Sequence, residues 1–434
     1  MNTETNNNGN VFKNKNFLLV FLGAIVSELG ALLYSFAVGF YILEISDNNA
    51  FLQGLYLALC GISTLVFTPV GGVLGDRADK AKIMYICDYL KGGLIIAATV
   101  LMLVFRESQA HIVILFVLGI LGNAVSGIFS PASGALLPHI VEENKLQQAN
   151  SYFSMKNAFE GIIGIILAGI LYSALPIHIL FFIVGASFVA SAISEMFIHY
   201  DFTPPEERLT LKVAFADMKD GIDYLRTKKA ILAMTFAVLF INFFIAPVTG
   251  NFIPYFIKTD LASAPSYLFD NLLTPELWSS VVSVFFGISS LLGAAVMSAL
   301  PQKEKCGFST AKKLCIYAVL MIALTAGYHI LVSMGISINA FLIVLCAGGL
   351  MMGFFLSLIN IPLSTVLMRI VDKDKLSKVN SIISIGSQGM IPLASVLAGV
   401  IISSLGCTAL LVFCSAGFAG TALMMLFNRH IREI

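Results

Sequence analysis

Residues 140–151 read IVEENKLQQANS and residues 370–381 read IVDKDKLSKVNS, so one pattern recurs 230 positions later in the chain. The match continues without a gap into the apolar stretch after each segment. There Ser154, Ala168, Gly169 and Ser173 recur as Ser384, Ala398, Gly399 and Ser403. Shared hydrophobicity alone does not produce equal spacing across a polar loop and a whole apolar stretch. We therefore interpret the chain as a parallel internal repeat of two similar halves.

The composition of the chain is that of a membrane protein. Hydrophobic residues make up 58% and charged residues only 12%, whereas soluble domains carry about 25% charged residues. A helix needs about 20 apolar residues to cross a bilayer, and twelve stretches reach that length. They are 17–43, 52–74, 83–105, 111–130, 151–174, 177–199, 230–257, 278–299, 311–333, 337–362, 378–403 and 406–428. The prediction is an all-α integral membrane protein with twelve transmembrane helices in two pseudo-symmetric six-helix bundles.

Positive charges fall almost wholly into alternate gaps between these spans. Of the 26 Lys and Arg residues, 22 lie at the termini, in every second loop or within the first three residues of the span that follows such a loop, and together these positions form one side. The opposite side carries Arg106 and Lys258, and Lys91 and Lys156 lie deeper within spans. Because Lys and Arg near a span resist translocation, we expect both termini in the cytoplasm and a multi-pass protein of the plasma or inner membrane.

The longest cytoplasmic segment, 200–229, separates six spans from six. Its apolar residues recur at helical spacing among charges, which predicts either an amphipathic helix along the membrane or a simple connector. The predicted organisation is a disordered N-terminus (1–16), an N-terminal bundle (17–199), this linker (200–229), a C-terminal bundle (230–428) and a cytoplasmic C-terminus (429–434). On the external side, Trp278 follows an irregular loop and is expected as an interfacial anchor.

The loop after the second span, residues 71–82, reads GGVLGDRADKAK. Its glycines permit close helix approach, Asp76 can lie against the positive end of a helix, and Arg77 can pair with an acid. With Gly72, Lys80 and Asp88 these residues would form a conformational clasp. The alternative is that the charges only obey the positive-inside rule. The motif resembles the loop signature of the major facilitator superfamily, which is a Gly, a small or apolar stretch, Asp-Arg and a basic cluster.

The resemblance covers nearly the whole chain. Residues 128–138 read IFSPASGALLP, and with Leu146, Ala149, Asn150 and Ser151 they look like the branch of the superfamily that holds macrolide-efflux proteins and enterobactin-type siderophore exporters. This resemblance implies secondary export of an amphipathic compound, driven by proton entry. It does not identify the compound.

Two acids interrupt the spans deeply. Glu28 lies near the middle of the first span, where an ionised carboxylate costs several kcal/mol unless it faces a cavity or a partner. We therefore expect it to bind a proton or a cation, or to be a structural hydrogen-bonded acid. Glu160 lies in the fifth span, with Lys156 one turn earlier on the same face. This pair is either a substrate or proton site or an internal ion pair.

Other polar residues of the spans have two interpretations each. Asp88 and Lys91 either join the clasp or pair locally. Glu44, Glu195 and His199 lie close to span ends, where an interfacial position is expected. Four amides can hydrogen-bond a substrate in a cavity or hold helices together, namely Asn123, Asn242, Asn360 and Gln388.

The sequence contains no Walker loop, no nucleophile–base pattern and no metal-ligand cluster, and its seven cysteines form no CxxC. We expect no enzyme activity and no cofactor, with the proton-motive force as the energy source. The acids share the cytoplasmic loops with the bases, so no nucleic-acid partner is predicted. The expected protein is a monomeric, proton-coupled exporter of an amphipathic drug- or macrolide-like molecule within the lipid bilayer. The alternatives are a siderophore or lysolipid-like exporter, a membrane-embedded enzyme, and a non-transporting sensor.

Overall fold

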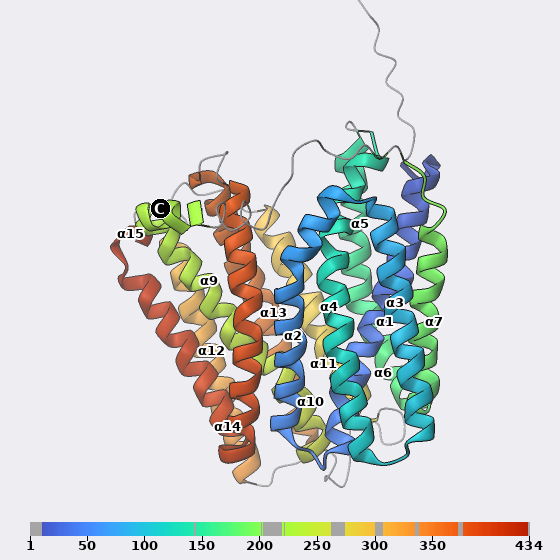
Figure 1. Cartoon of the computed structure of the whole chain (residues 1–434). Helices are drawn as coiled ribbons and strands as arrows, with labels where there is room; N and C mark the ends of the chain where they lie inside the picture. Colours follow the sequence, from blue (N-terminus) through green and yellow to red (C-terminus); the bar gives the residue numbers. More distant parts are fainter. Residues whose placement is uncertain are drawn as a thin grey trace, which may run out of the picture.

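The computed structural model describes residues 11–142, 145–200, 202, 219–220, 222–261, 274–299, 307–334, 338–371 and 376–432. Within these ranges, eleven helices are long and apolar enough to cross a membrane. Figure 1 shows the helices lying roughly side by side, with both ends of the described chain at the top. We call that end of the molecule the terminal end, and the opposite end, which carries the turn at Asp47 and Asn48, the distal end.

Polar caps begin the first helices of the chain. Asn14 and Asn49 accept hydrogen bonds from the backbone at Phe17 and Leu52, and Asp79 accepts from Ala81 and Lys82. Pro176 then separates two helices at the distal end. The helices are α1 (Lys15–Ile45), α2 (Ala50–Arg77), α3 (Lys80–Val104), α4 (Ser108–Ile140), α5 (Leu146–Phe159), η3 (Glu160–Gly164), α6 (Ile165–Ala174) and α7 (Ile177–Glu195).

The second half of the chain repeats this run of long apolar helices. Its first span is broken into short segments by two π-helical stretches, η4 and η5. The elements are α9 (Lys229–Pro247), η4 (Val248–Phe252), α10 (Ile253–Phe256), η5 (Ile257–Leu261), α11 (Pro275–Ala299), α12 (Gly307–Ser333), α13 (Ile338–Ile370), α14 (Leu376–Phe427) and α15 (Arg429–Arg432).

The helix α14 contains a reversal of direction. Its 52 residues would extend about 78 Å at 1.5 Å per residue, more than twice the hydrocarbon thickness of about 30 Å. Gly406 has φ 81° and ψ 175°, a left-handed conformation that glycine adopts without steric cost. The chain turns there, so the two parts of α14 are separate rods, as the sequence expectation of a break before 406 requires.

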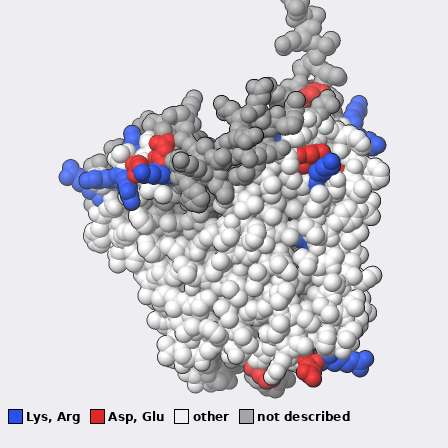
Figure 2. Space-filling model, in the orientation of Figure 1, with Lys and Arg blue, Asp and Glu red and all other residues white. Residues whose placement is uncertain are grey.

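The apolar cores follow the two halves of the chain. One cluster of buried residues joins helices from Leu33 to Phe188, and a second joins Leu225 to Ile431 with Phe40 and Ala50 added from the first half. Figure 2 shows most charged side chains gathered at the two ends of the molecule, with a wide belt between them that is almost free of charge. This distribution fits a molecule whose middle faces hydrocarbon.

Three details differ from the sequence expectations. The chain is helical through the motif as far as Arg77, so residues 71–77 are not a loop. Val11–Lys13 form a short 3₁₀ turn with Val11 buried, so the last part of the N-terminal segment is ordered. Trp278, in the first turn of α11, is buried in the apolar core of the second half, so it is not an interfacial anchor. Most of the linker at 200–229 lies outside the described residues, as do residues 1–10.

The α2–α4 crossing is set by glycines that let the two backbones touch. A Cβ atom on Gly71 would lie 2.6 Å from the carbonyl oxygen of Gly127 and from Cα of Ile128. At Gly72, the next residue, a Cβ atom would meet nothing within 4 Å. Of these two neighbouring glycines in the motif, Gly71 is therefore the one that the packing requires.

We expect Gly71→Ala to lower the free energy of unfolding by about 1–3 kcal/mol, because overpacking at a helix crossing forces the backbones apart. Gly72→Ala is the matched control and should be neutral or slightly stabilising, since Ala is the better helix former. Thermal unfolding of the purified protein in detergent measures both. Equal melting temperatures for the two variants would contradict the assignment of Gly71 to the contact.

Candidate functional site

The structure brings Glu28, Lys156 and Glu160 together. The ammonium of Lys156 lies 2.6 Å from Oε2 of Glu28 on α1 and 3.2 Å from Oε2 of Glu160, one turn later at the start of η3. The side chains of Lys156 and Glu160 are 1% and 4% exposed, whereas that of Glu28 is 50% exposed. We call these three residues the acid–lysine triad.

The triad carries one acid more than Lys156 can neutralise. Oε1 of Glu160 is buried and has no hydrogen-bond partner among the described residues. Two carboxylates beside one ammonium leave one net negative charge, which is costly in a water-poor interior. The more exposed Glu28 is the member of the triad that can exchange a proton or meet a cation from solution.

A cavity of about 600 Å³ lies beside the triad and takes its walls from both halves of the chain. The first half contributes Asn157, Gly161, Ile162 and Ile165, which flank the triad residues in sequence, and the second half contributes α9 to α13. Two of the wall segments, η3 and η4, are π-helical. Such stretches are frequent at functional sites, because the wider turn re-aims side chains within a helix.

The walls of this central cavity are mainly apolar. Aromatic and aliphatic side chains such as Phe252, Phe286 and Met352 dominate it. Its hydrogen-bonding side chains are Asn157, Thr249, Ser283 and Ser290. These four residues are not predicted from the sequence, although Asn157 adjoins Lys156. Serine and threonine are too common in membrane helices to stand out without a structure.

None of the four amides expected in a cavity lines the central cavity. Asn242 donates to the carbonyl of Val238 within its own helix, and Asn360 and Gln388 are exposed. None of these three lines the central cavity. Asn123 donates to the carbonyl of Gly119 and accepts from Thr64 across the α2–α4 contact, so it holds helices together.

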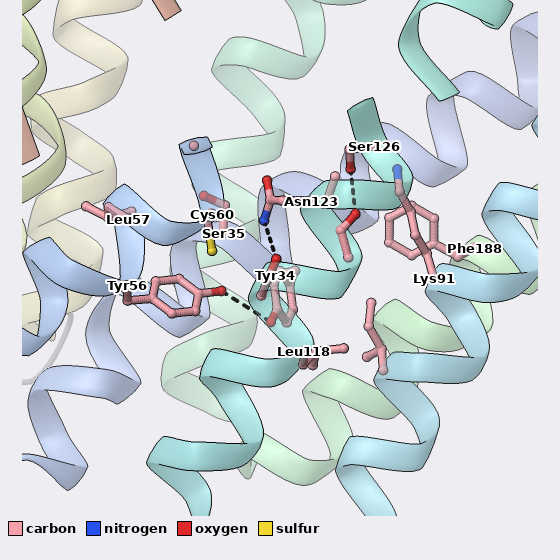
Figure 3. A pocket seen from close by; sticks show the side chains of 16 residues that line it. Tyr34, Ser35, Tyr56, Leu57, Cys60, Lys91, Leu118, Asn123, Ser126 and Phe188 are labelled. Atoms are coloured by element: carbon pink, nitrogen blue, oxygen red, sulfur yellow. Dashed lines mark hydrogen bonds between the residues drawn. The ribbon is translucent and has the colours of Figure 1, made fainter. Parts of the chain in front are cut away.

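Asn123 also lines a second cavity, of about 310 Å³, inside the first half (Figure 3). In this view Tyr34 and Tyr56 point toward one another, with hydroxyl oxygens 3.4 Å apart. Lys91 and Phe188 close the opposite side of this cavity. Among the described residues, this smaller cavity takes its walls from α1, α2, α3, α4 and α7 alone.

The structure describes only part of the proposed clasp. The side chains of Asp76 and Arg77 lie outside the described part of the chain, so their contacts stay a prediction. Lys80 is buried, its backbone N–H donates to the hydroxyl of Tyr200, and its ammonium lies 5.5 Å from the ring centroid of Phe202. Burial raises the pKa of the Tyr200 phenol, which keeps it neutral as this acceptor.

Two acids near the terminal end are fully buried. Asp88 is 0% exposed, and Glu195 is 1% exposed at the end of α7. The expectation of an interfacial position is therefore wrong for Glu195, because α1 and α3 cover the end of α7. Glu44, by contrast, is half exposed at the distal end, as expected.

Polar contacts join the two halves at the distal end. Lys258 of η5 and Tyr172 of α6 both lie 3.2 Å from Oε2 of Glu44. The hydroxyls of Ser173 and Thr274 are 2.7 Å apart. We call these five residues the distal seal.

Helix packing continues the seal toward the middle of the molecule. Ser280 of α11 donates to the carbonyl of Ile165, and Gly54 and Gly61 of α2 lie against Ser395 and Pro392 of α14. These contacts hold the two halves against each other on the distal side in this structure.

The similarity of this chain to known proteins identifies its family. The model of the Major Facilitator Superfamily matches residues 20–331, and the chain belongs to this family of membrane transporters. It is 26% identical to the uncharacterized MFS-type transporter YfiS of Bacillus subtilis, over 98% of this chain and 95% of that protein. It is 26% identical to the multi-drug resistance efflux pump PmrA of Streptococcus pneumoniae, over 59% of each chain. Macrolide efflux protein A of Streptococcus pyogenes is 24% identical over 54% of this chain and 57% of that protein.

Solved structures show the same fold. A bacterial homologue of the iron transporter ferroportin matches with a TM-score of 0.68 in its inward-facing state, at 17% identity, covering 95% of this chain and 100% of that chain. The outward-facing state of such a homologue matches with a TM-score of 0.60, at 18% identity, covering 95% of this chain and 98% of that chain. The resemblance to the superfamily seen in the sequence is confirmed, including its efflux-protein relatives.

We expect Lys156→Met to lower the free energy of unfolding by about 3–5 kcal/mol, because it leaves the buried Glu160 carboxylate without its partner. Adding Glu160→Gln to the same chain should restore most of the loss, since the uncompensated charge is then gone. Thermal unfolding in detergent measures both variants.

The matched control is Lys145→Met, which breaks the Lys145–Glu142 ion pair at the surface. An exposed pair contributes about 0–1 kcal/mol, so this variant should unfold close to the wild type. If Lys156→Met also unfolds like the wild type, Lys156 does not neutralise the triad.

Proposed function

We propose that this chain is a secondary active transporter that exports an amphipathic small molecule by alternating access, coupled to proton entry. The observation that carries the proposal is the central cavity shared by both halves, with the acid–lysine triad beside it. Its volume of about 600 Å³ lies within the range of about 300–1,000 Å³ typical of small-molecule sites. A largely apolar wall with a few hydroxyl and amide groups suits a drug- or macrolide-like ligand.

The proposed topology is twelve crossings in two six-helix bundles, with α14 supplying two of them and both termini in the cytoplasm. The charge distribution along the sequence supports this orientation. The distal seal is then on the external face, and the structure is closed to the outside. We place this transporter in the plasma membrane, where it would act as a monomer. The proposed energy source is the proton-motive force, and no cofactor is required.

Transport of a panel of compounds into proteoliposomes with an imposed pH gradient tests this function. One proton crossing a gradient of one pH unit is worth about 1.4 kcal/mol, which corresponds to about tenfold accumulation of a solute coupled to one proton. The panel should contain macrolides, siderophores and lysolipids, because these are the rival substrate classes. A folded protein that transports none of them under any gradient would favour a non-transporting sensor.

We expect Glu28→Gln to abolish gradient-driven accumulation while leaving downhill equilibration of the same substrate. Without the Glu28 carboxylate, Lys156 and Glu160 balance each other and no proton is required. The matched control is Glu107→Gln, an exposed acid at the start of α4 whose side chain makes no capping hydrogen bond. Unchanged accumulation and an unchanged pH profile in Glu28→Gln would show that Glu28 has no coupling role.

A further inference from the structure

A second pair of acids lies in the first half, apart from the triad and the central cavity. Asp88 of α3 and Glu195 of α7 are buried, and no oxygen of either carboxyl group has a hydrogen-bond partner among the described residues. Two unpartnered carboxyl groups at one helix contact are unusual, because each ionised group would lose its hydration without compensation.

The packing of three helices places these acids together. The backbones of α3 and α7 meet at Gly92, where a Cβ atom would lie 2.8 Å from the carbonyl oxygen of Gly185. Asp88 is one turn before Gly92 on the same face of α3, toward the end of α7 where Glu195 lies. Gly23 of α1 closes the third side, since its Cβ position is 3.7 Å from Cγ of Glu195.

The hydroxyl of Ser191 lies close enough to Asp88 to stabilise its carboxylate, but outside hydrogen-bonding geometry. Ser191 lies one turn before Glu195, and its hydroxyl donates to the carbonyl oxygen of Gly23 at 3.0 Å. Its single proton is therefore already used in holding α7 against α1.

The cation that acts electrostatically on both acids is Lys91, one turn after Asp88. Its ammonium lies 5.0 Å and 5.3 Å from the ring centroids of Phe129 on α4 and Phe188 on α7. The thiol of Cys87 on α3 and the carboxylate of Glu28 on α1 also act on Lys91. Glu28 is already bound to Lys156, so Lys91 is the cation left for the buried pair.

We propose that Asp88 and Glu195 form a second proton-binding site of this transporter, which binds one proton on one or other of the two carboxyl groups. Two carboxylates and one ammonium leave one negative charge in a water-poor helix contact, and one bound proton removes it. Lys91 lines the smaller cavity of the first half with Asn123 and Ser126 (Figure 3), and water in that cavity is the proposed route of the proton to the site. The role of this site in coupling rests on the proposed function, but its bound proton can be detected without a transport measurement.

Infrared spectroscopy of the full chain in lipid nanodiscs at neutral pH counts this proton through the carbonyl stretch of protonated carboxyl groups. Asp88→Asn and Glu195→Gln should each remove the intensity of one protonated carboxyl, because the remaining acid is then balanced by Lys91. Lys91→Met should instead double the intensity that the pair contributes, since both acids must then be protonated.

Glu107→Gln, the exposed acid on α4, is the control and should leave this band unchanged. The proposal is overturned if either amide variant retains the full wild-type intensity, or if Lys91→Met folds and gains none. Should Lys91→Met fail to fold, the two amide variants decide alone.

The same variants separate this site from the function. If the proton is present but proteoliposomes show no proton-driven transport, the proposed function fails and the binding site stands. If transport is proton-driven but the amide variants keep the band, the function stands and this site is wrong.

Discussion

The structure depends on the neutralisation of charges that the bilayer does not solvate. Lys156 meets this constraint by lying between Glu28 and Glu160, where it holds α1 against the start of η3. A single lysine cannot balance both acids, so the contact is stable only with an additional positive charge or with Glu28 in contact with water. The negative charge that must be neutralised for these helices to pack therefore also makes this site sensitive to protons.

Both halves of the chain consist of long apolar helices, but their chemistry differs. At the positions 230 residues after Lys156 and Glu160, the second half has Gly386 and Met390. The buried charged side chains of the described residues, Lys80, Asp88, Lys156, Glu160 and Glu195, all belong to the first half. The second half supplies much of the apolar wall of the central cavity. In the proposed mechanism the first half therefore binds protons, the second half contributes most of the substrate surface, and the cavity between them joins the two.

Local spacing predicted much of the fold and part of the site. Runs of about 20 apolar residues located the membrane helices, and the spacing of four residues between Lys156 and Glu160 predicted their common face. The approach of Glu28 to Lys156 depends on how α1 packs against α5, which no local pattern encodes. Burial of Glu195 was missed for the same reason, because its place at a span end gives no sign of the helices that cover it. The glycines of the motif predicted close helix packing. Only the α2–α4 geometry shows that Gly71, and not Gly72, lies at the contact.

The central claim is that the distal seal between the halves must open for each transport cycle. The direct test is to join Ser173→Cys and Thr274→Cys by a disulfide in a background without the seven native cysteines, since the two hydroxyls are 2.7 Å apart. A disulfide between Thr325→Cys and Ser415→Cys, whose hydroxyls are 2.9 Å apart within the second half, is the matched control. The account predicts that the first disulfide stops transport and that reduction restores it, while the control disulfide leaves transport intact. Full transport by completely cross-linked Ser173→Cys/Thr274→Cys protein would contradict alternating access through this seal.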